Sequence, residues 1–413
     1  MGMSYMQAQT ELRRTNSRLG ESREYAPVPN SDAAGVNEIN EAEGLQNLFG
    51  DHKILTSMLL FVPCGFASFY LEWPPQAVFG LNFLAVIPLA WLIGKSTEDL
   101  AASVGETLGG LLNATFGNVV EMLLCVNGIR NNEIIVVQCT LLGSILSNLL
   151  LVLGGSFFVG GLFYKTLDFC QQGAATQCSL LAMSVFAIGL PTIYVTILHQ
   201  DQEWEHMVAV SRWAAIFLLL TYFAYLWFQL KTHRDLFEPE GEHGEEEQPD
   251  LTPCIASVLL GITTVTTAFA THFLIHSIRG TVDVWQVSEE FIGIIMLPII
   301  GNAAEHYTAI VVASKNKLDL SLGVAAGSSC QMALLVTPFT VLCGWFYDIE
   351  MTLDFHSFQL VVLLLSVFLA TTILQNGKSN WLEGMMLLVT YLVCALIYFF
   401  EGASKATSLA TLN

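Results

Sequence analysis

The sequence predicts an all-α integral membrane protein because it is strongly apolar, carries little charge and contains long apolar runs. Hydrophobic residues make up 53% of the 413 residues and charged residues only 13%, about half the share that is usual in soluble proteins. The apolar runs are long enough to cross a bilayer as helices. The formal net charge of −20 argues against a nucleic-acid partner.

We expect about eleven transmembrane helices. They cover residues 54–71, 77–95, 104–128, 133–161, 173–198, 208–230, 254–278, 287–314, 318–346, 355–375 and 380–400. Residues 1–52 are polar and predict a mostly disordered cytosolic tail without a cleavable signal peptide. With that tail in the cytosol, twelve Lys and Arg residues fall on the cytosolic side and four on the other. The bias predicts a cytosolic N-terminus and a luminal C-terminus.

Two halves of the chain share landmarks at a fixed offset of 184 residues. "GNVVE" (117–121) aligns with "GNAAE" (301–305), Asn132 aligns with Asn316, and the "GS" pair at 143–144 aligns with the pair at 327–328. Each copy has an odd number of spans, so the two copies insert in opposite orientations. This pattern predicts the inverted repeats of secondary transporters, whose site lies near the midplane between the repeats.

The predicted order is therefore one additional helix followed by two five-helix repeats. The segments after the tail are the additional helix (53–76), the first repeat (77–230), an acidic cytosolic linker (231–251), the second repeat (252–401) and a short C-terminal tail (402–413).

Each motif places an amide and a carboxylate on one helical face within apolar surroundings. Asn118 and Glu121 are three residues apart, as are Asn302 and Glu305, and this spacing brings the side chains together on a helix. Carboxylate and amide oxygens suit Ca²⁺, which takes six to eight oxygen ligands. The hydroxyl groups of the "GS" serines lie one helix later in each repeat and could bond the carboxylates or coordinate the ion.

Two carboxylates close together in a low-dielectric cavity cannot both remain ionised without a cation. A site that holds either protons or a metal ion is the thermodynamic basis of an antiporter. The alternative is structural: each carboxylate–Asn pair would only lock helices together. The symmetric repetition of the pair favours the functional interpretation.

The longer motifs resemble a known family. "NATFGNVVEMLL" with "LLGSILSNLLLVLG", and "LPIIGNAAEH" with "GSSCQMALLVTPF", resemble the two signature repeats of the calcium/proton exchangers, a branch of the cation/calcium exchanger superfamily. The resemblance covers nearly all of residues 53–400 and is nearest to the fungal vacuolar exchangers. It implies a secondary antiporter that moves cytosolic Ca²⁺ into an acidic organelle, the vacuole, in exchange for H⁺.

The resemblance also implies roles for individual residues. Glu121 and Glu305 would bind Ca²⁺ and protons alternately, and His306 would take part in proton binding. The supporting polar groups around the ion would be Asn118, Asn302, Ser144, Ser328 and Gln331. No cofactor is implied, since Ca²⁺ and H⁺ are the transported ions.

The linker carries a dense run of acidic residues. Its glutamates are Glu238, Glu240, Glu242, Glu245, Glu246 and Glu247. They could collect or sense cytosolic cations by electrostatic focusing, or they could form an ordinary solvated linker. The sequence does not decide between these two interpretations.

Competing functions remain open at this stage. One is a passive divalent-cation channel or uniporter built on the same oxygen ligands, and another is an antiporter whose main substrate is Mn²⁺. An enzyme is not expected, because neither HExxH nor any paired nucleophile and base occurs. Besides its ions and the lipid bilayer, the chain requires no partner, and its oligomeric state is not specified.

Overall fold

The protein is described by a computed structural model, which places residues 41–198, 204–236 and 249–412. This part of the chain is almost entirely helical; its two strands, β1 (Leu167–Asp168) and β2 (Lys378–Ser379), form one short antiparallel ladder. The α-helices are α2 (Glu41–Asp51), α3 (Lys53–Met58), α4 (Phe61–Tyr70), α5 (Pro75–Val104), α6 (Glu106–Phe116), α7 (Val119–Arg130), α8 (Ile134–Leu146), α9 (Leu153–Phe163), α10 (Gln171–Leu198), α11 (Trp204–Trp227), α12 (Pro253–His276), α13 (Ile278–Trp285), α14 (Glu289–Phe291), α15 (Leu297–Gly301), α16 (Ala303–Ser314), α17 (Leu318–Gln331), α18 (Thr337–Phe346), α19 (Ser357–Leu374) and α20 (Trp381–Leu412). Wider π-helical turns form η1 (Ser147–Val152), η2 (Phe228–Thr232), η4 (Ile292–Met296) and η5 (Met332–Val336), and η3 (Arg234–Leu236) is a 3-10 turn.

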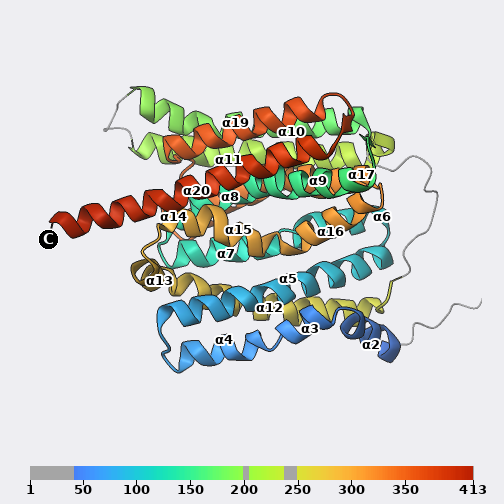
Figure 1. Cartoon of the computed structure of the whole chain (residues 1–413), viewed down its shortest axis with the longest axis horizontal. Coiled ribbons are helices and arrows are strands. Elements are labelled where there is room, and N and C mark those ends of the chain that lie inside the picture. The colour runs from blue at the N-terminus through green and yellow to red at the C-terminus, as the bar shows by residue number, and fades with distance from the viewer. Residues whose placement is uncertain (1–40, 199–203, 237–248, 413) are drawn as a thin grey trace, which may run out of the picture. The chain divides into compact units, whose positions relative to one another are not determined.

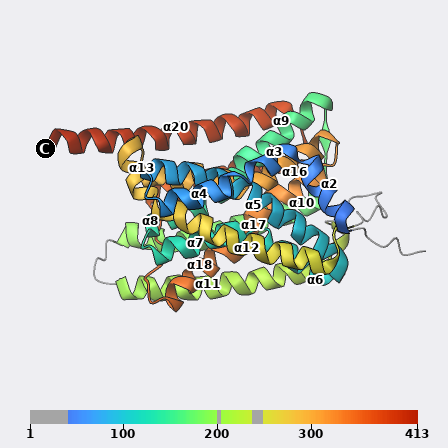
Figure 2. The same ribbon diagram turned by 90° about the horizontal axis from the view of Figure 1, so that it is seen from below.

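The prediction of an all-α integral membrane protein is confirmed. Within the described ranges, nine helices are long and apolar enough to cross a membrane, or up to eleven if each of two bent helix pairs is one span. Most of the helices lie side by side along one direction (Figures 1 and 2). Outward-facing apolar side chains such as Phe346 and Phe368, 83% and 70% exposed, suit a lipid environment.

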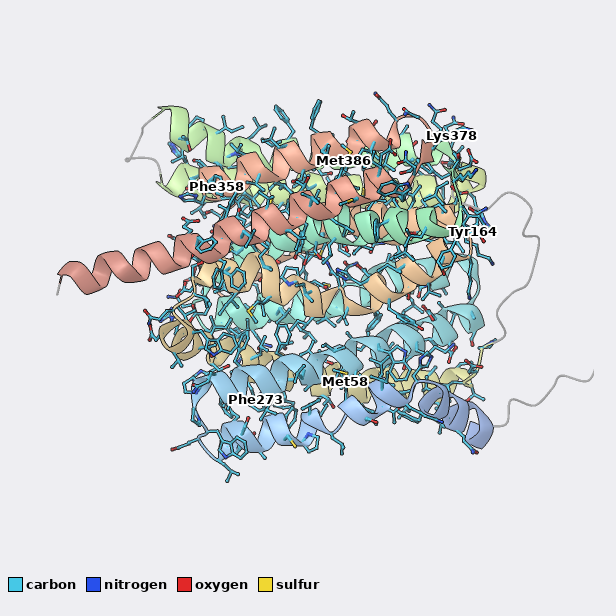
Figure 3. The ribbon with its side chains drawn as sticks, in the orientation of Figure 1. Met58, Tyr164, Phe273, Phe358, Lys378 and Met386 are labelled. Carbon is cyan, nitrogen blue, oxygen red and sulfur yellow. The ribbon has the colours of Figure 1, made fainter. Side chains whose placement is uncertain are left out.

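The two ends of this bundle are distinct. Helix α13 lies at one end, whereas α2 and α6 lie at the other (Figure 1). The side chains of Tyr164 and Lys378 are at the same end as α2, while Phe358 is near the opposite end (Figure 3). Figure 1 also shows that the chain passes from α6 to α7 in the direction opposite to its passage from α15 to α16.

Backbone details repeat at the same offset of 184 residues, which agrees with the predicted inverted repeats. Asn132 and Asn316 both have positive φ, 58° and 63°. Each follows a motif helix, and the amide of each donates to a carbonyl three residues earlier, that of Ile129 or Ala313. The π-helical turns η1 and η5 follow α8 and α17 at matching positions. The fold is therefore one N-terminal helical segment followed by two inverted five-helix repeats.

The matched spans 134–163 and 318–346 occupy the interior. Of their apolar windows, 78% and 72% are buried, against 11% for the first span, 53–70. Their burial explains why the "GS" serines and the asparagine that follows them lie away from lipid. These two spans therefore supply polar side chains to the centre of the bundle.

Two segments differ from the expected order at its ends. Helix α2 lies within the stretch 1–52 expected to be disordered; its residue Leu48 packs with Leu92, Leu251 and Ala256, and this apolar contact stabilises a helix that composition alone does not indicate. Residues 1–40 of that stretch lie outside the described residues. Helix α20 continues to Leu412, through the residues expected to form a C-terminal tail.

Candidate functional site

The first motif lies at a break between two helices. Helix α6 ends at Phe116 and α7 begins at Val119, and the two helices are bent by 45°. Between them Asn118 adopts φ −107° and ψ 15°, outside the helical range. A Gly residue before a polar residue favours such a break, and a break inside a membrane is tolerated where it faces protein or a cavity.

The second motif repeats this geometry. Helix α15 ends at Gly301 and α16 begins at Ala303, with Asn302 between them at φ −88° and ψ 12°. Asn118 and Asn302 are each 1% exposed. The local sequence therefore imposes the same interruption on both repeats.

The two motifs meet at their glutamate and glycine residues. Glu121 is only 2% exposed, and its Oε2 has no hydrogen-bond partner among the described residues. A Cβ atom added to Gly301 would lie 2.5 Å from Glu121 Oε1, so the first carboxyl group packs directly against the second helix break. Glu305 interacts electrostatically with Glu121, and its Oε2 is likewise buried without a partner in the described part of the chain.

Amide and hydroxyl groups from the two central spans surround these carboxyl groups. Asn148 and Ser328 contact the Glu305 carboxyl group, and Asn148 Nδ2 donates to Ser328 Oγ at 2.9 Å. Asn118 Nδ2 donates to Gln331 Oε1 at 2.5 Å. These contacts cross between the repeats, from the first to the second.

Asn302 and Ser144 complete the group. Asn302 Nδ2 donates to the main-chain carbonyl of Ser144 at 3.4 Å, while Ser144 Oγ is buried with no partner among the described residues. The structure thus brings together all seven residues expected around the ion: Glu121, Glu305, Asn118, Asn302, Ser144, Ser328 and Gln331. It adds Asn148, which the sequence reasoning missed as a site residue although it lies four residues after Ser144, on the same helical face.

His306 points away from these oxygens. Its Nδ1 lies 2.6 Å from the Asn302 carbonyl oxygen and its Nε2 lies 3.3 Å from Ser147 Oγ. Both ring nitrogens therefore face protein groups on α16 and η1. Ser147 is a second polar residue that the sequence reasoning did not place in this region.

The donor set is oxygen-rich and poor in classical metal clusters. Among the described residues, no group of three or more His, Cys, Asp or Glu side chains could hold a metal ion. The two carboxyl groups are instead accompanied by amides and hydroxyls. Such neutral and anionic oxygen donors suit a hard divalent cation better than a soft one.

A cavity of about 400 Å³ leads to one of the two glutamates. Glu305, Ser328 and Gln331 line its inner part, and Glu98 and Gln229 line its outer part, where α5 and η2 approach the end of the bundle that carries α6. Glu121 is not among the lining residues. The site is therefore reached from one end, through the second motif.

The acidic linker is described only at its margins. Its six glutamates, Glu238, Glu240, Glu242, Glu245, Glu246 and Glu247, lie outside the described residues. At its end Asp250 pairs with Lys95 at 2.8 Å, and Lys95 also pairs with Asp99 at 3.3 Å. This ion-pair group joins the linker to α5 beside the outer part of the cavity.

Comparison with known proteins agrees with this geometry. Residues 76–231 and 255–400 match the model of the sodium/calcium exchanger protein family. The chain belongs to this family. The two matched stretches correspond to the two repeats and leave out the first span and the linker.

Relatives within the family include both eukaryotic and bacterial proteins. The chain is 41% identical over 345 residues to a vacuolar calcium ion transporter of Schizosaccharomyces pombe, covering 83% of this chain and 84% of the relative. It is 40% identical to a Ca²⁺/H⁺ antiporter of Aphanothece halophytica, covering 86% and 98%. Among solved structures, native YfkE matches with a TM-score of 0.73 and 33% identity, covering 84% of this chain and 99% of that one.

Proposed function

We propose that this exchanger-family member is a secondary antiporter that moves cytosolic Ca²⁺ into an acidic compartment, the vacuole, in exchange for H⁺. The observation that carries the proposal is the meeting of Glu121 and Glu305 at two helix breaks, each with a buried, unpartnered carboxyl oxygen. The names of the relatives, which include a vacuolar calcium ion transporter and a Ca²⁺/H⁺ antiporter, support the same ions and the same compartment.

In this proposal the two carboxyl groups hold either Ca²⁺ or protons. Unpaired carboxylates buried in a low-dielectric interior are costly, so protons occupy them when the cation is absent. An arriving Ca²⁺ neutralises both groups and displaces the protons. Because the two ionic states exclude each other, movement of one ion across the membrane is coupled to movement of the other.

The neutral groups complete the proposed ion site. Ser328 and Asn148 contact Glu305 directly, and Gln331 holds Asn118. Asn302 and the unpartnered Ser144 hydroxyl provide oxygens on the other side. His306 is proposed to take part in proton binding next to Glu305, although its ring faces Ser147 rather than the cavity.

The energetics require more than one proton for a modest pH gradient. Moving Ca²⁺ against a thousand- to ten-thousandfold gradient costs about 4–5.5 kcal/mol, whereas one proton supplies about 1.36 kcal/mol per pH unit. Across roughly two pH units, two protons supply about 5.4 kcal/mol. Two carboxyl groups are able to carry that number.

The direct test is Ca²⁺ uptake by vesicles containing the purified protein, with and without an acid-inside pH gradient. We expect uptake only with the gradient, together with alkalinisation of the lumen. Glu121→Gln and Glu305→Gln should each abolish uptake, while Glu350→Gln, in an exposed loop, should not. Competition by Mn²⁺ in the same assay measures its rank as a substrate.

Two results would contradict the proposal. Uptake that is indifferent to the pH gradient and moves no protons would indicate a channel or uniporter. Uptake that survives both glutamate substitutions would assign the two motifs to helix packing alone.

A further inference from the structure

The end of the bundle opposite the cavity is held by an ion pair between the repeats. Arg279 Nε on α13 lies 2.6 Å from Glu133 Oε1, which precedes α8. Arg279 Nη2 also approaches the main-chain carbonyl of Asn132 at 3.5 Å. The Glu133 side chain is 8% exposed and that of Arg279 is 62% exposed, so the arginine covers a carboxylate that is otherwise shut in.

This pair is far from the mouth of the cavity. A Cβ added to Gly280, next to Arg279, would contact Pro75 at the start of α5, whereas Glu98 near the other end of α5 lines the cavity. The 23 residues between Pro75 and Glu98 correspond to roughly 35 Å along a helix. One end of the protein is thus open to the site and the other carries the pair.

The repeat symmetry shows that this pair has no counterpart at the open end. The offset of 184 residues relates Arg279 to Lys95 and Glu133 to Lys317. The positions equivalent to the pair are therefore two cations, which cannot form an ion pair with each other. Lys95 instead pairs with Asp250 and Asp99.

The helices that carry these residues differ in the same way. In the first repeat α5 is continuous from Pro75 to Val104, but in the second repeat the equivalent helix ends at His276 and resumes as α13 at Ile278. Helix α13 is bent by 115° from the segment 289–301 that leads to the second motif. Movement of α13 is therefore connected through a short stretch of chain to Gly301.

We propose that Arg279 and Glu133 form a latch that keeps the far end closed while the site is open to the cavity, and that the latch separates when the site turns to the other side. This inference rests on the proposed antiport. Because Glu133 is buried, loss of its cation leaves an uncompensated charge in the closed state. Removing the arginine should therefore raise the population of the state open at the far end.

Nearby carboxyl groups strengthen this dependence on one arginine. Glu289 interacts electrostatically with Glu133, Asp283 and Glu290 as well as with Arg279. Without the guanidinium group, these carboxylates would repel one another across the junction of α13, α14 and the start of α8. Repulsion favours separation of the same elements.

The test measures access to Cys125, which lies between the first motif and the latch. Cys125 is 1% exposed, four residues beyond Glu121 on α7, and contacts Thr340. A small hydrophilic thiol reagent is applied to the full-length protein in vesicles from the latch side, in the absence of Ca²⁺, and modification is read residue by residue by mass spectrometry. We expect Arg279→Gln to raise the modification rate of Cys125 roughly threefold or more.

Three further variants separate the latch from a general loss of structure. Arg279→Lys keeps the charge and should retain most of the protection, and the exchanged pair Glu133→Arg with Arg279→Glu should restore it. Lys378→Gln is the matched control, because its ion pair with Asp168 at 2.9 Å also joins the two repeats but is 66% exposed on both partners. It should leave Cys125 protected.

Unchanged modification of Cys125 in both Arg279→Gln and Glu133→Gln would overturn the latch. Equal increases in these variants and in Lys378→Gln would do the same. The labelling requires no transport, so it distinguishes a failed latch from a failed antiport: wild-type protein that does not exchange Ca²⁺ for H⁺ would contradict the function while leaving the labelling result standing.

Discussion

The two glutamate motifs have nearly the same sequence and the same helix break, yet their surroundings differ. Glu121 is enclosed, packed against Gly301, while Glu305 lines the cavity with Ser328 and Gln331. Asn118 makes a short side-chain bond at 2.5 Å, whereas Asn302 makes a long one to a main-chain carbonyl at 3.4 Å. Sequence symmetry therefore does not extend to access.

This difference is what the alternating-access proposal requires. If the protein were symmetric in space as well as in sequence, the site would be equally open, or equally closed, at both ends. Here the cavity reaches the second motif, and the opposite end is covered by α13. The exposed and enclosed glutamates are expected to exchange surroundings when the site turns.

The largest effect should come from adding bulk where the two motifs touch. Gly301→Val would place a branched side chain against the Glu121 carboxyl group, and a displacement of about 1 Å in such a site can cost roughly a hundredfold in rate. We expect Ca²⁺ uptake to fall by that order. Gly80→Val, where an added Cβ meets no atom within 4 Å, is the control, and equal loss in both variants would contradict the packing argument.

The two asparagines should differ in importance. Asn118→Ala removes a short bond to Gln331, and we expect roughly a tenfold weaker apparent affinity for Ca²⁺, equivalent to about 1.4 kcal/mol. Asn302→Ala removes only a long bond, and we expect a change of roughly two- to threefold. The concentration dependence of uptake measures both; the reverse order would show that the bond lengths do not report the strength of ion binding.

Access to the two motif helices can be compared at equivalent positions. Thr308 lines the cavity, whereas Leu124, the residue 184 positions earlier, is 2% exposed. In a background without reactive cysteines, Thr308→Cys should react with a hydrophilic thiol reagent about tenfold faster than Leu124→Cys. Similar rates would mean that both motifs are equally accessible from that end.

The smallest effect should be a pH-dependent gain in stability in a loop of the second repeat. Burial raises the pKa of Asp354 above its ordinary value, so the folded state favours its protonated form, and the stability it contributes is lost as pH rises through the folded pKa. Asp354→Asn should therefore raise Tm by about 1 °C at pH 8 and leave it unchanged at pH 4. Asp168→Asn, in an ion pair exposed on both partners, should show no such gain.

Much of the fold followed from local pattern. Apolar runs located the spans, and the fixed offset between the two motifs located the repeats, because each depends on residues that are neighbours in sequence. Helix α2 was missed because its stability comes from contacts of Leu48 with distant residues such as Leu92 and Leu251. Asn148 was missed because nothing in the chain order shows that it reaches Glu305.

The sequence by itself determined which residues could serve the site: carboxylates are tolerated in lipid only with a purpose, and the repeated Gly-Asn-x-x-Glu pattern marks them by chemistry and spacing alone. The tertiary structure decided which glutamate faces the cavity, which asparagine is tightly held and where Arg279 meets Glu133. These properties depend on how two nearly equivalent repeats pack against each other. Packing is a property of the whole bundle, so two copies of one pattern acquire different surroundings.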